Sequence, residues 1–256
     1  MVQATHKTIL ITGGAKRIGR ALSLALAEDG WNVAIHYFGS SEHAEMLAHT
    51  LQQHGCQVAT LYADLSDEDE TRKLVASATD ALGPVGALVN NASIFEEEQW
   101  DEVTSYSWAR HLNVNLYAPF ILSQDFARAL PSESHGVITN IIDQRVFNLT
   151  PNFFSYTISK SGLWAMTQTL ALALAPRIRV NGVGPGPTLA NEHQTEETFM
   201  AQARATPLQR KVDVEDIANA VKYLLGASTV TGQMIAVDSG EHLGWAQPVE
   251  GQHKDG

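Results

Sequence analysis

Short runs of apolar and β-branched residues alternate along the chain with longer segments in which apolar side chains recur at helical spacing. The short runs predict strands at residues 8–11, 32–37, 57–62, 87–90, 136–142, 177–183 and 233–237. The longer segments predict helices at residues 17–29, 41–54, 67–82, 103–130, 155–174 and 214–226. This alternation is typical of βαβ units, so we predict the α/β fold class with a parallel sheet covered on both faces.

The chain has 256 residues, of which 44% are hydrophobic, and this is enough to bury one substantial core. Because neither an internal repeat nor a linker interrupts the pattern, we expect a single domain over residues 1–256. Residues 188–207 are polar and helix-prone, and we expect them to form a lid over a cleft. Residues 247–256 are polar, and we expect a frayed tail there.

The formal net charge of −11 argues against a nucleic acid or an anionic membrane as a partner. Any anionic ligand must therefore be held by local donors. The single cysteine, Cys56, excludes an internal disulfide and fits a reducing compartment. No apolar run reaches the ~18 residues of a membrane span, and no signal segment precedes the first strand, so we expect a cytoplasmic protein. The ten histidines show no zinc-like spacing, and we expect no metal site.

A glycine-rich turn at residues 12–19 joins the first predicted strand to the first predicted helix. Glycines let the backbone approach a pyrophosphate, and a helix N-terminus offers free N–H groups and the positive end of a dipole. The turn therefore predicts a dinucleotide site.

The end of the second strand bears on the choice of cofactor. A site for NAD usually carries an acidic residue there, about 20 residues after the turn, to bind the ribose 2′-hydroxyl. No acidic residue lies between Gly30 and Ser41. Lys16, Arg17 and the hydroxyls of Ser40 and Ser41 are available as donors to a 2′-phosphate. We therefore predict NADPH rather than NADH.

Tyr156 and Lys160 are four residues apart on a predicted helix, so both side chains lie on one face. We expect the Lys160 ammonium, together with a charge on the cofactor, to lower the pKa of the Tyr156 phenol from its ordinary value near ~10 and to make it a useful acid–base group. Asp143 stands thirteen residues before the tyrosine.

Over nearly its whole length the chain resembles the short-chain dehydrogenase/reductase family. The matching motifs follow the family's order: the turn at 12–19, Asp64-Leu65, Asn90-Asn91-Ala92, Asn113-Val114-Asn115-Leu116, Tyr156-x-x-x-Lys160 and Pro185-Gly186. The resemblance implies a Rossmann-type, doubly wound parallel sheet of about seven strands and a homotetramer. It also implies that Tyr156 is the general acid, that Lys160 binds the nicotinamide ribose and that Asn115 holds a proton-relay water. The remaining cofactor contacts implied are Gly13, Lys16, Arg17, Ile18, His36, Tyr37, Ser40, Asp64, Leu65, Asn91, Ala92, Ser93, Pro185 and Gly186.

Two positions depart from the family's common pattern. Arg17 replaces a glycine of the turn, and Asp143 replaces the serine that donates to a substrate carbonyl. A hydroxyl stabilises a developing alkoxide, whereas an ionised carboxylate only accepts hydrogen bonds and repels it. Asp143 therefore suits a substrate that presents N–H donors or that needs a proton on nitrogen.

Pteridine reductases, including the dihydromonapterin and alternative dihydrofolate reductases, share both departures. In that subgroup a phenylalanine stacks on the pterin, and Phe95 stands at its position. The resemblance implies a pterin between Phe95 and the nicotinamide, with Arg17, Ser93, Asp143 and Tyr156 at its edge. We thus predict an NADPH-dependent reductase of a C=N bond in a pterin or dihydrofolate-like ring.

Several alternatives stay open at this stage. One alternative is a carbonyl or alcohol oxidoreductase of the same family. Another is a non-catalytic NADP(H)-binding sensor. Three candidate site residues also have alternative, purely structural interpretations. These are a turn cap for Asp143, a core aromatic for Phe95 and a solvated side chain for Arg17. We interpret the acidic run at 96–98 as a solvated loop. Arg145 has two readings, as a ligand for a substrate carboxylate or as a structural or interface residue.

Overall fold

The computed structural model describes residues 4–190 and 194–244, which form one α/β domain around a parallel sheet. The strand order is β3-β2-β1-β4-β5-β6-β7. The strands are β1 (Thr8–Ile11), β2 (Asn32–Tyr37), β3 (Val58–Tyr62), β4 (Val85–Asn90), β5 (Gly136–Ile141), β6 (Ile178–Pro185) and β7 (Met234–Val237). All pairings between neighbouring strands are parallel, so the predicted Rossmann-type, doubly wound sheet is confirmed.

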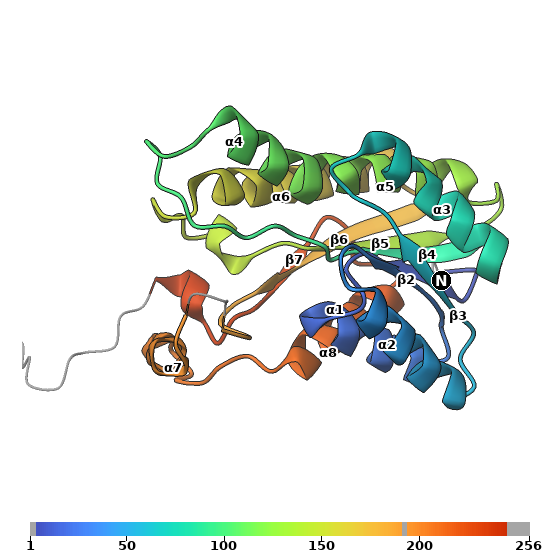
Figure 1. Ribbon diagram of the computed structural model, residues 1–256. Helices are drawn as coiled ribbons and strands as arrows, with labels where there is room; N and C mark the ends of the chain where they lie inside the picture. The colour runs from blue at the N-terminus through green and yellow to red at the C-terminus, as the bar shows by residue number, and fades with distance from the viewer. Residues whose placement is uncertain (1–3, 191–193, 245–256) are drawn as a thin grey trace, which may run out of the picture.

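Two helical layers enclose the sheet (Figure 1). One layer contains α1 (Arg17–Glu28), α2 (Ser41–Gln53) and α8 (Val214–Gly226). The other contains α3 (Glu68–Leu82), α4 (Ser105–Leu112), α5 (Ala118–Ala129) and α6 (Phe154–Leu174). A further helix, α7 (Glu196–Ala205), lies beyond the end of the sheet, within the segment predicted to be a lid.

The strands supply both hydrophobic cores because successive side chains point to opposite faces of a sheet. In β1, Ile9 and Ile11 pack into the core shared with α1, α2 and α8, while Leu10 packs into the core on the other face. All three side chains are fully buried. Burial on both faces explains why β1 is a continuous apolar run.

The strand order reverses between β1 and β4, since β1 connects onward to β2 on one side and β4 connects to β5 on the other. In open α/β sheets, ligands bind outside the carboxyl ends of the strands at such a switch point. The glycine turn after β1 and the asparagines after β4 both lie at this edge.

The long helix predicted at 103–130 is present but not regular. It consists of α4, a π-helical turn (Asn113–Tyr117) and α5, which follow one another without leaving the helical backbone conformation. The wider turn contains Asn115, whose side chain is bonded to another segment, and Pro119 at the start of α5 lacks an N–H. The predicted tail, residues 247–256, lies outside the described residues. Among the described helices, none has the length and apolar character needed to cross a bilayer.

Candidate active site

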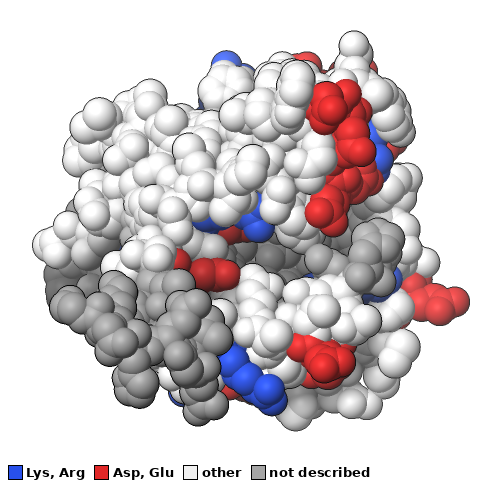
Figure 2. Space-filling view, turned by 90° about the vertical axis from the view of Figure 1, so that its left-hand side faces the viewer, with Lys and Arg blue, Asp and Glu red and all other residues white. Residues whose placement is uncertain are grey.

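A cleft of about 1050 Å³ opens at the carboxyl ends of the strands. Figure 2 looks onto this end of the molecule, where the surface is hollowed near its centre and acidic side chains gather on the rim. Every predicted site residue except Asn115 lines the cleft. The fold therefore brings together motifs that are spread over residues 13–186 of the chain.

The turn after β1 is held against the end of β4. Gly13 has a φ of +60°, and a Cβ added there would lie 3.1 Å from the Ala92 Cα. Asn91 Nδ2 donates to the Thr12 carbonyl at 2.8 Å, while Thr12 Oγ1 accepts from the Asn91 and Ala92 N–H groups at 2.9 and 3.0 Å. The turn thus leaves its glycine backbone open to the cleft and uses side chains to fix its shape.

His36 supports this turn from beneath. Gly13 N–H donates to His36 Nδ1 at 3.0 Å, and Nε2 lies 3.0 Å from the Ala63 carbonyl, so Nε2 carries the proton. Burial lowers the pKa of His36 to about 4. Both ring nitrogens are engaged within the protein, so His36 shapes the cofactor end of the cleft without offering a free donor to it.

Arg17 begins α1 with a φ of +50°, a backbone conformation that glycine adopts without strain. Its guanidinium donates to the Ala190 and Leu189 carbonyls at 3.1 and 3.2 Å. Arg17 therefore lines the cleft, but its hydrogen bonds run to the segment after β6.

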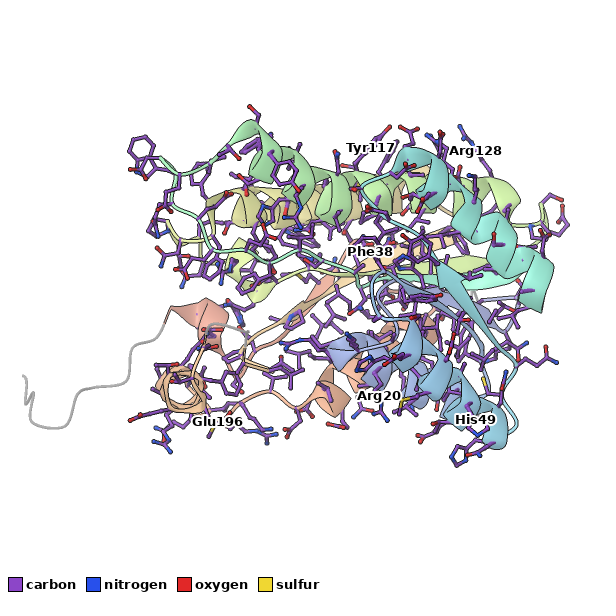
Figure 3. The ribbon with its side chains drawn as sticks, in the orientation of Figure 1. Arg20, Phe38, His49, Tyr117, Arg128 and Glu196 are labelled. Atoms are coloured by element: carbon purple, nitrogen blue, oxygen red, sulfur yellow. The ribbon has the colours of Figure 1, made fainter. Side chains whose placement is uncertain are left out.

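The end of β2 carries no carboxylate toward the cleft. Phe38 extends from this strand end, is 58% exposed and packs against Tyr62 with ring centroids 6.1 Å apart (Figure 3). Asp64, after β3, is turned to its own loop, where Oδ1 accepts from the N–H and hydroxyl of Ser66 at 2.8 and 2.7 Å. Lys16 and Ser40 also line the cleft and can act as donors.

Asp143 and Tyr156 meet at the centre of the cleft. Tyr156 Oη donates to Asp143 Oδ2 at 2.8 Å, while Asp143 Oδ1 accepts from the Arg145 N–H at 2.8 Å. Arg145 Nε lies 3.5 Å from Asp143 Oδ2. Asp143 is thus the cap of a short turn and also the partner of the phenol, so the two readings of this residue are compatible.

Lys160 by itself does not lower the pKa of the Tyr156 phenol. Burial and the neighbouring Asp143 carboxylate raise the pKa of Tyr156 well above its ordinary value, and Arg145 only partly offsets them. Lys160 Nζ donates to the Ile141 carbonyl at 2.9 Å and lies 5.7 Å from the Tyr156 ring centroid. Burial lowers the pKa of Lys160 to about 8.

Asn115 lies behind the cleft, in the π-helical turn, and is fully buried. Its Nδ2 donates to the Ile94 carbonyl at 2.9 Å and to Ser159 Oγ at 3.0 Å. Its Oδ1 accepts from the Ile94 N–H at 2.8 Å and from Ser93 Oγ at 3.2 Å. The side chain therefore fastens the loop after β4 to α6.

An aromatic wall stands beside the phenol. Phe95 stacks on Phe153 with centroids 4.3 Å apart and an interplanar angle of 9°, and it meets Tyr156 edge-on at 4.7 Å. The Arg145 guanidinium lies 4.9 Å from the Phe153 centroid. Phe95 is 40% exposed, so it is not a core aromatic. A flat apolar surface is therefore available for a planar ligand.

Sequence reasoning missed several residues of the cleft. Phe153 and Gln144 gave no motif signal, and Arg145 was recognised without a clear role. Glu241, far along the chain, accepts from Gln144 Nε2 at 2.9 Å and from Gln202 Nε2 at 3.0 Å, and burial raises the pKa of its carboxyl. The solvated interpretation of 96–98 was wrong for Glu98, which is only 7% exposed.

Comparison with known proteins agrees with this geometry. A family model described as "Enoyl-(Acyl carrier protein) reductase" matches residues 13–242. The chain is 30% identical to the 3-oxoacyl-[acyl-carrier-protein] reductase FabG of Staphylococcus epidermidis over 246 residues, covering 93% of this chain and all of that protein. The chain therefore belongs to the short-chain dehydrogenase/reductase family of oxidoreductases.

Two solved structures are especially similar. The FolM alternative dihydrofolate reductase 1 of Brucella suis, in complex with NADP, has a TM-score of 0.92 and 46% identity, covering 97% of this chain and 99% of that one. A blue fluorescent protein from a metagenomic library, in complex with NADPH, has a TM-score of 0.85 and 34% identity, covering 93% and 99%.

Proposed function

We propose that the protein is an NADPH-dependent reductase of a C=N bond in a pterin or dihydrofolate-like ring. The observation that carries this proposal is the hydrogen bond from Tyr156 Oη to Asp143 Oδ2. A carboxylate beside the phenol disfavours an oxyanion and favours a substrate that receives a proton on nitrogen. The similarity to the alternative dihydrofolate reductases of Brucella supports the same substrate class.

The cleft fits a dinucleotide at the turn after β1. Gly13 and Gly186 both pass so close to neighbouring backbone that a Cβ would crowd Ala92 and Asp238, respectively. The absence of a carboxylate at the end of β2, with Lys16 and Ser40 nearby, supports NADPH rather than NADH. The similar structures that hold NADP or NADPH support the same choice. When bound, NADPH would supply the hydride.

Proton delivery falls to Tyr156. Its raised pKa keeps the proton on the phenol until a substrate nitrogen accepts it. The C=N bond gains a hydride on carbon and this proton on nitrogen, so the net charge of the substrate does not change. The Lys160 ammonium and the Arg145 guanidinium offset the negative charge left beside Asp143, and a proton from solvent restores the phenol.

Substrate orientation falls to the aromatic wall and the cleft's polar edge. The stacked rings of Phe95 and Phe153 offer a surface for a flat heteroaromatic ring, worth about 1 kcal/mol beyond area burial. Ser93 and Arg17 line the same cleft and are proposed as edge contacts. Asp143 is proposed to face the ring nitrogens.

A second candidate is an NADP(H)-dependent carbonyl reductase. It is favoured by the similarity to FabG over the full length of that protein. Against this candidate, the chain has no hydroxyl donor at position 143, where the Asp143 carboxylate accepts from the phenol.

The experiment that separates the two is a substrate screen under NADPH, with NADH as control. Purified protein is expected to oxidise NADPH with dihydrobiopterin, dihydromonapterin or dihydrofolate. Reduction of ketones, without reduction of any of these three compounds, would reject the proposal. Stoichiometric NADPH binding without turnover of any carbonyl or imine would instead identify a sensor.

We further propose a homotetramer and a lid formed by residues 188–207, of which α7 is the described helical part. Light scattering on the purified protein tests the tetramer, and a monomer would contradict it. Hydrogen exchange with and without NADPH tests the lid, since closure predicts slower exchange in α7 when the cofactor is bound.

A further inference from the structure

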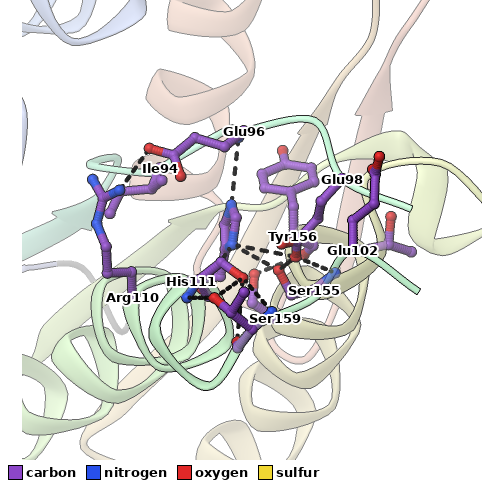
Figure 4. Close-up of polar contacts among 12 residues, drawn as sticks. Ile94, Glu96, Glu98, Glu102, Arg110, His111, Ser155, Tyr156 and Ser159 are labelled. Carbon is purple, nitrogen blue, oxygen red and sulfur yellow. Dashed lines mark hydrogen bonds and ion pairs between the residues drawn. The ribbon is translucent and has the colours of Figure 1, made fainter. Parts of the chain in front are cut away.

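A buried polar cluster lies directly beside Tyr156 but outside the cleft (Figure 4). It joins Glu98 from the loop after β4, His111 from α4 and Ser155 from the first turn of α6. Glu98 is 7% exposed, and the other two side chains are fully buried. None of the three enters the chemistry proposed above, so their burial calls for a separate explanation.

The cluster contains a serine, a histidine and a carboxylate, but its geometry is not that of a nucleophilic triad. In a triad the serine and the carboxylate lie on opposite nitrogens of the imidazole. Here Ser155 Oγ and Glu98 Oε1 both lie on the Nδ1 side of His111, at 2.6 and 3.9 Å, and Nε2 accepts from the Glu96 N–H at 3.4 Å. A fully buried hydroxyl is also closed to a substrate.

Glu98 instead caps the helix that carries Tyr156. The residue before α6, Phe153, has a φ of +55° and gives no side-chain cap, so the first N–H groups of the helix need other partners. Phe154 N–H donates to the Glu98 carbonyl at 3.2 Å, and Ser155 N–H donates to Glu98 Oε1 at 3.3 Å. The Ser155 hydroxyl bonds the same carboxylate.

The carboxylate suits this position electrostatically. A negative charge at a helix N-terminus interacts favourably with the helix dipole. Burial opposes the charge, but the hydrogen bonds from Ser155 and Ser107, with the nearby His111, outweigh burial and lower the pKa of Glu98. Glu98 is therefore an ionised acceptor held inside the protein.

One carboxylate thus connects the two ring systems of the proposed site. Glu98 follows Phe95 by three residues on one loop, and Tyr156 is the third residue of the capped helix. The Phe95 and His111 rings each meet the Tyr156 ring edge-on, with centroids 4.7 and 6.4 Å away. Displacement of the cap would move the phenol relative to the aromatic wall.

We infer that Glu98 is a positioning residue that holds Tyr156 and Phe95 in one fixed arrangement by capping α6 from the neighbouring loop. This inference rests on the proposed role of Tyr156 as the proton donor. Glu98 does not line the cleft and is proposed to act only through the residues that it anchors.

The first test is Glu98→Gln, with Asp101→Asn as the matched control because Asp101 is an exposed carboxylate on the same loop. We expect kcat of Glu98→Gln to fall about 10-fold or more while the Kd for NADPH stays within about 2-fold. Amide hydrogen exchange over residues 153–158 is expected to speed up in Glu98→Gln alone. Unchanged exchange or unchanged kcat would overturn the inference.

The assay uses whichever compound the wild-type protein reduces, pterin or carbonyl. A wild-type protein that reduces only ketones would therefore reject the pterin proposal and leave this test intact. The exchange measurement needs no substrate, so it decides the capping role even for a protein without turnover.

A double-mutant cycle separates positioning from a general loss of stability. In a Tyr156→Phe background, Glu98→Gln is expected to lower the residual rate by less than about 2-fold, because the phenol hydroxyl that Glu98 positions is already absent. A full additive loss would contradict the inference. Should Glu98→Gln not fold, Ser155→Ala keeps the backbone cap and removes the hydroxyl; a fall of about 3-fold in kcat is then expected, and a wild-type kcat would overturn the inference.

Discussion

The phenol of Tyr156 donates a hydrogen bond to the Asp143 carboxylate at 2.8 Å, in the position where a hydroxyl commonly serves the short-chain dehydrogenase/reductase family. This contact changes what the cleft accepts. A hydroxyl beside the phenol would donate to a substrate oxygen, whereas a carboxylate accepts from N–H groups and keeps the phenol protonated. The proposed preference for nitrogen heterocycles follows from this one substitution.

The first prediction concerns the aromatic wall. Phe95→Leu removes the ring that stacks on Phe153, and we expect the KM for a pterin to rise about 5-fold to 10-fold, as the loss of about 1 kcal/mol implies. The change in kcat is expected to be smaller. Phe147→Leu is the control, because Phe147 is a similarly exposed aromatic outside the cleft. Equal KM values for both variants would remove Phe95 from substrate binding.

The second prediction concerns the buried lysine. A folded-state pKa of about 8 instead of 10.5 means that the Lys160 ammonium costs the apo protein about 3 kcal/mol at neutral pH, at ~1.4 kcal/mol per pKa unit. Lys160→Met removes that cost but leaves the Ile141 carbonyl without its donor. We expect about 1–2 kcal/mol of net stabilisation with loss of turnover.

Denaturant unfolding across pH checks this. The folded state binds fewer protons than the unfolded state between pH 8 and 10.5, so wild-type stability is expected to rise with pH across that window. The gap between variant and wild type should narrow there. A variant less stable than the wild type at pH 7 would show that the buried ammonium does not destabilise the folded protein.

The third prediction concerns His36. Its pKa is about 4 in the folded protein against 6.5 in the unfolded chain, so its contribution to stability is complete above pH 6.5 and is lost as the pH falls toward 4. The loss amounts to about 3 kcal/mol. In His36→Asn the amide oxygen can still accept from the Gly13 N–H, and this part of the acid lability is expected to vanish. His49→Asn, at an exposed histidine, is the control and should keep the wild-type pH profile.

The fourth prediction concerns cofactor choice. Phe38→Asp places a carboxylate at the end of β2, where the structure has none. We expect the Kd for NADPH to rise about 10-fold or more through repulsion of the 2′-phosphate, while binding of NADH is unchanged or improved. Met46→Asp adds the same charge on the exposed face of α2 and serves as control. Equal effects on both cofactors would show that the strand end does not read the ribose.

The sequence predicts the strands well because their apolar runs are buried on both faces, as Ile9, Leu10 and Ile11 are. The meeting of Asp143 and Tyr156 was implied by the family resemblance, in which the residue thirteen positions before the tyrosine lies beside it. The π-helical turn around Asn115, inside the long predicted helix, was not foreseen because the side chain of Asn115 bonds to Ile94 and Ser159 in other segments.

Burial explains the remaining failures. The pKa of Tyr156 is raised because desolvation and Asp143 outweigh Arg145, and desolvation is not visible in a pattern of spacings. In the sequence Glu98 belongs to an acidic run that is typical of a solvated loop. It is buried because this loop packs against the start of α6, where Glu98 accepts from the Ser155 N–H. Phe153 stacks on Phe95 from a segment 58 residues further along the chain, and no sequence motif marks that contact.

The most direct test of the central claim is the substrate preference of Asp143→Ser. The measurement is the ratio of kcat/KM for a dihydropterin to kcat/KM for a ketone, under NADPH, in wild type and variant. We expect the ratio to fall by about 100-fold or more, with the Kd for NADPH unchanged within about 2-fold. A ratio that stays the same in Asp143→Ser would contradict the account, because the carboxylate would then have no part in selecting nitrogen over oxygen.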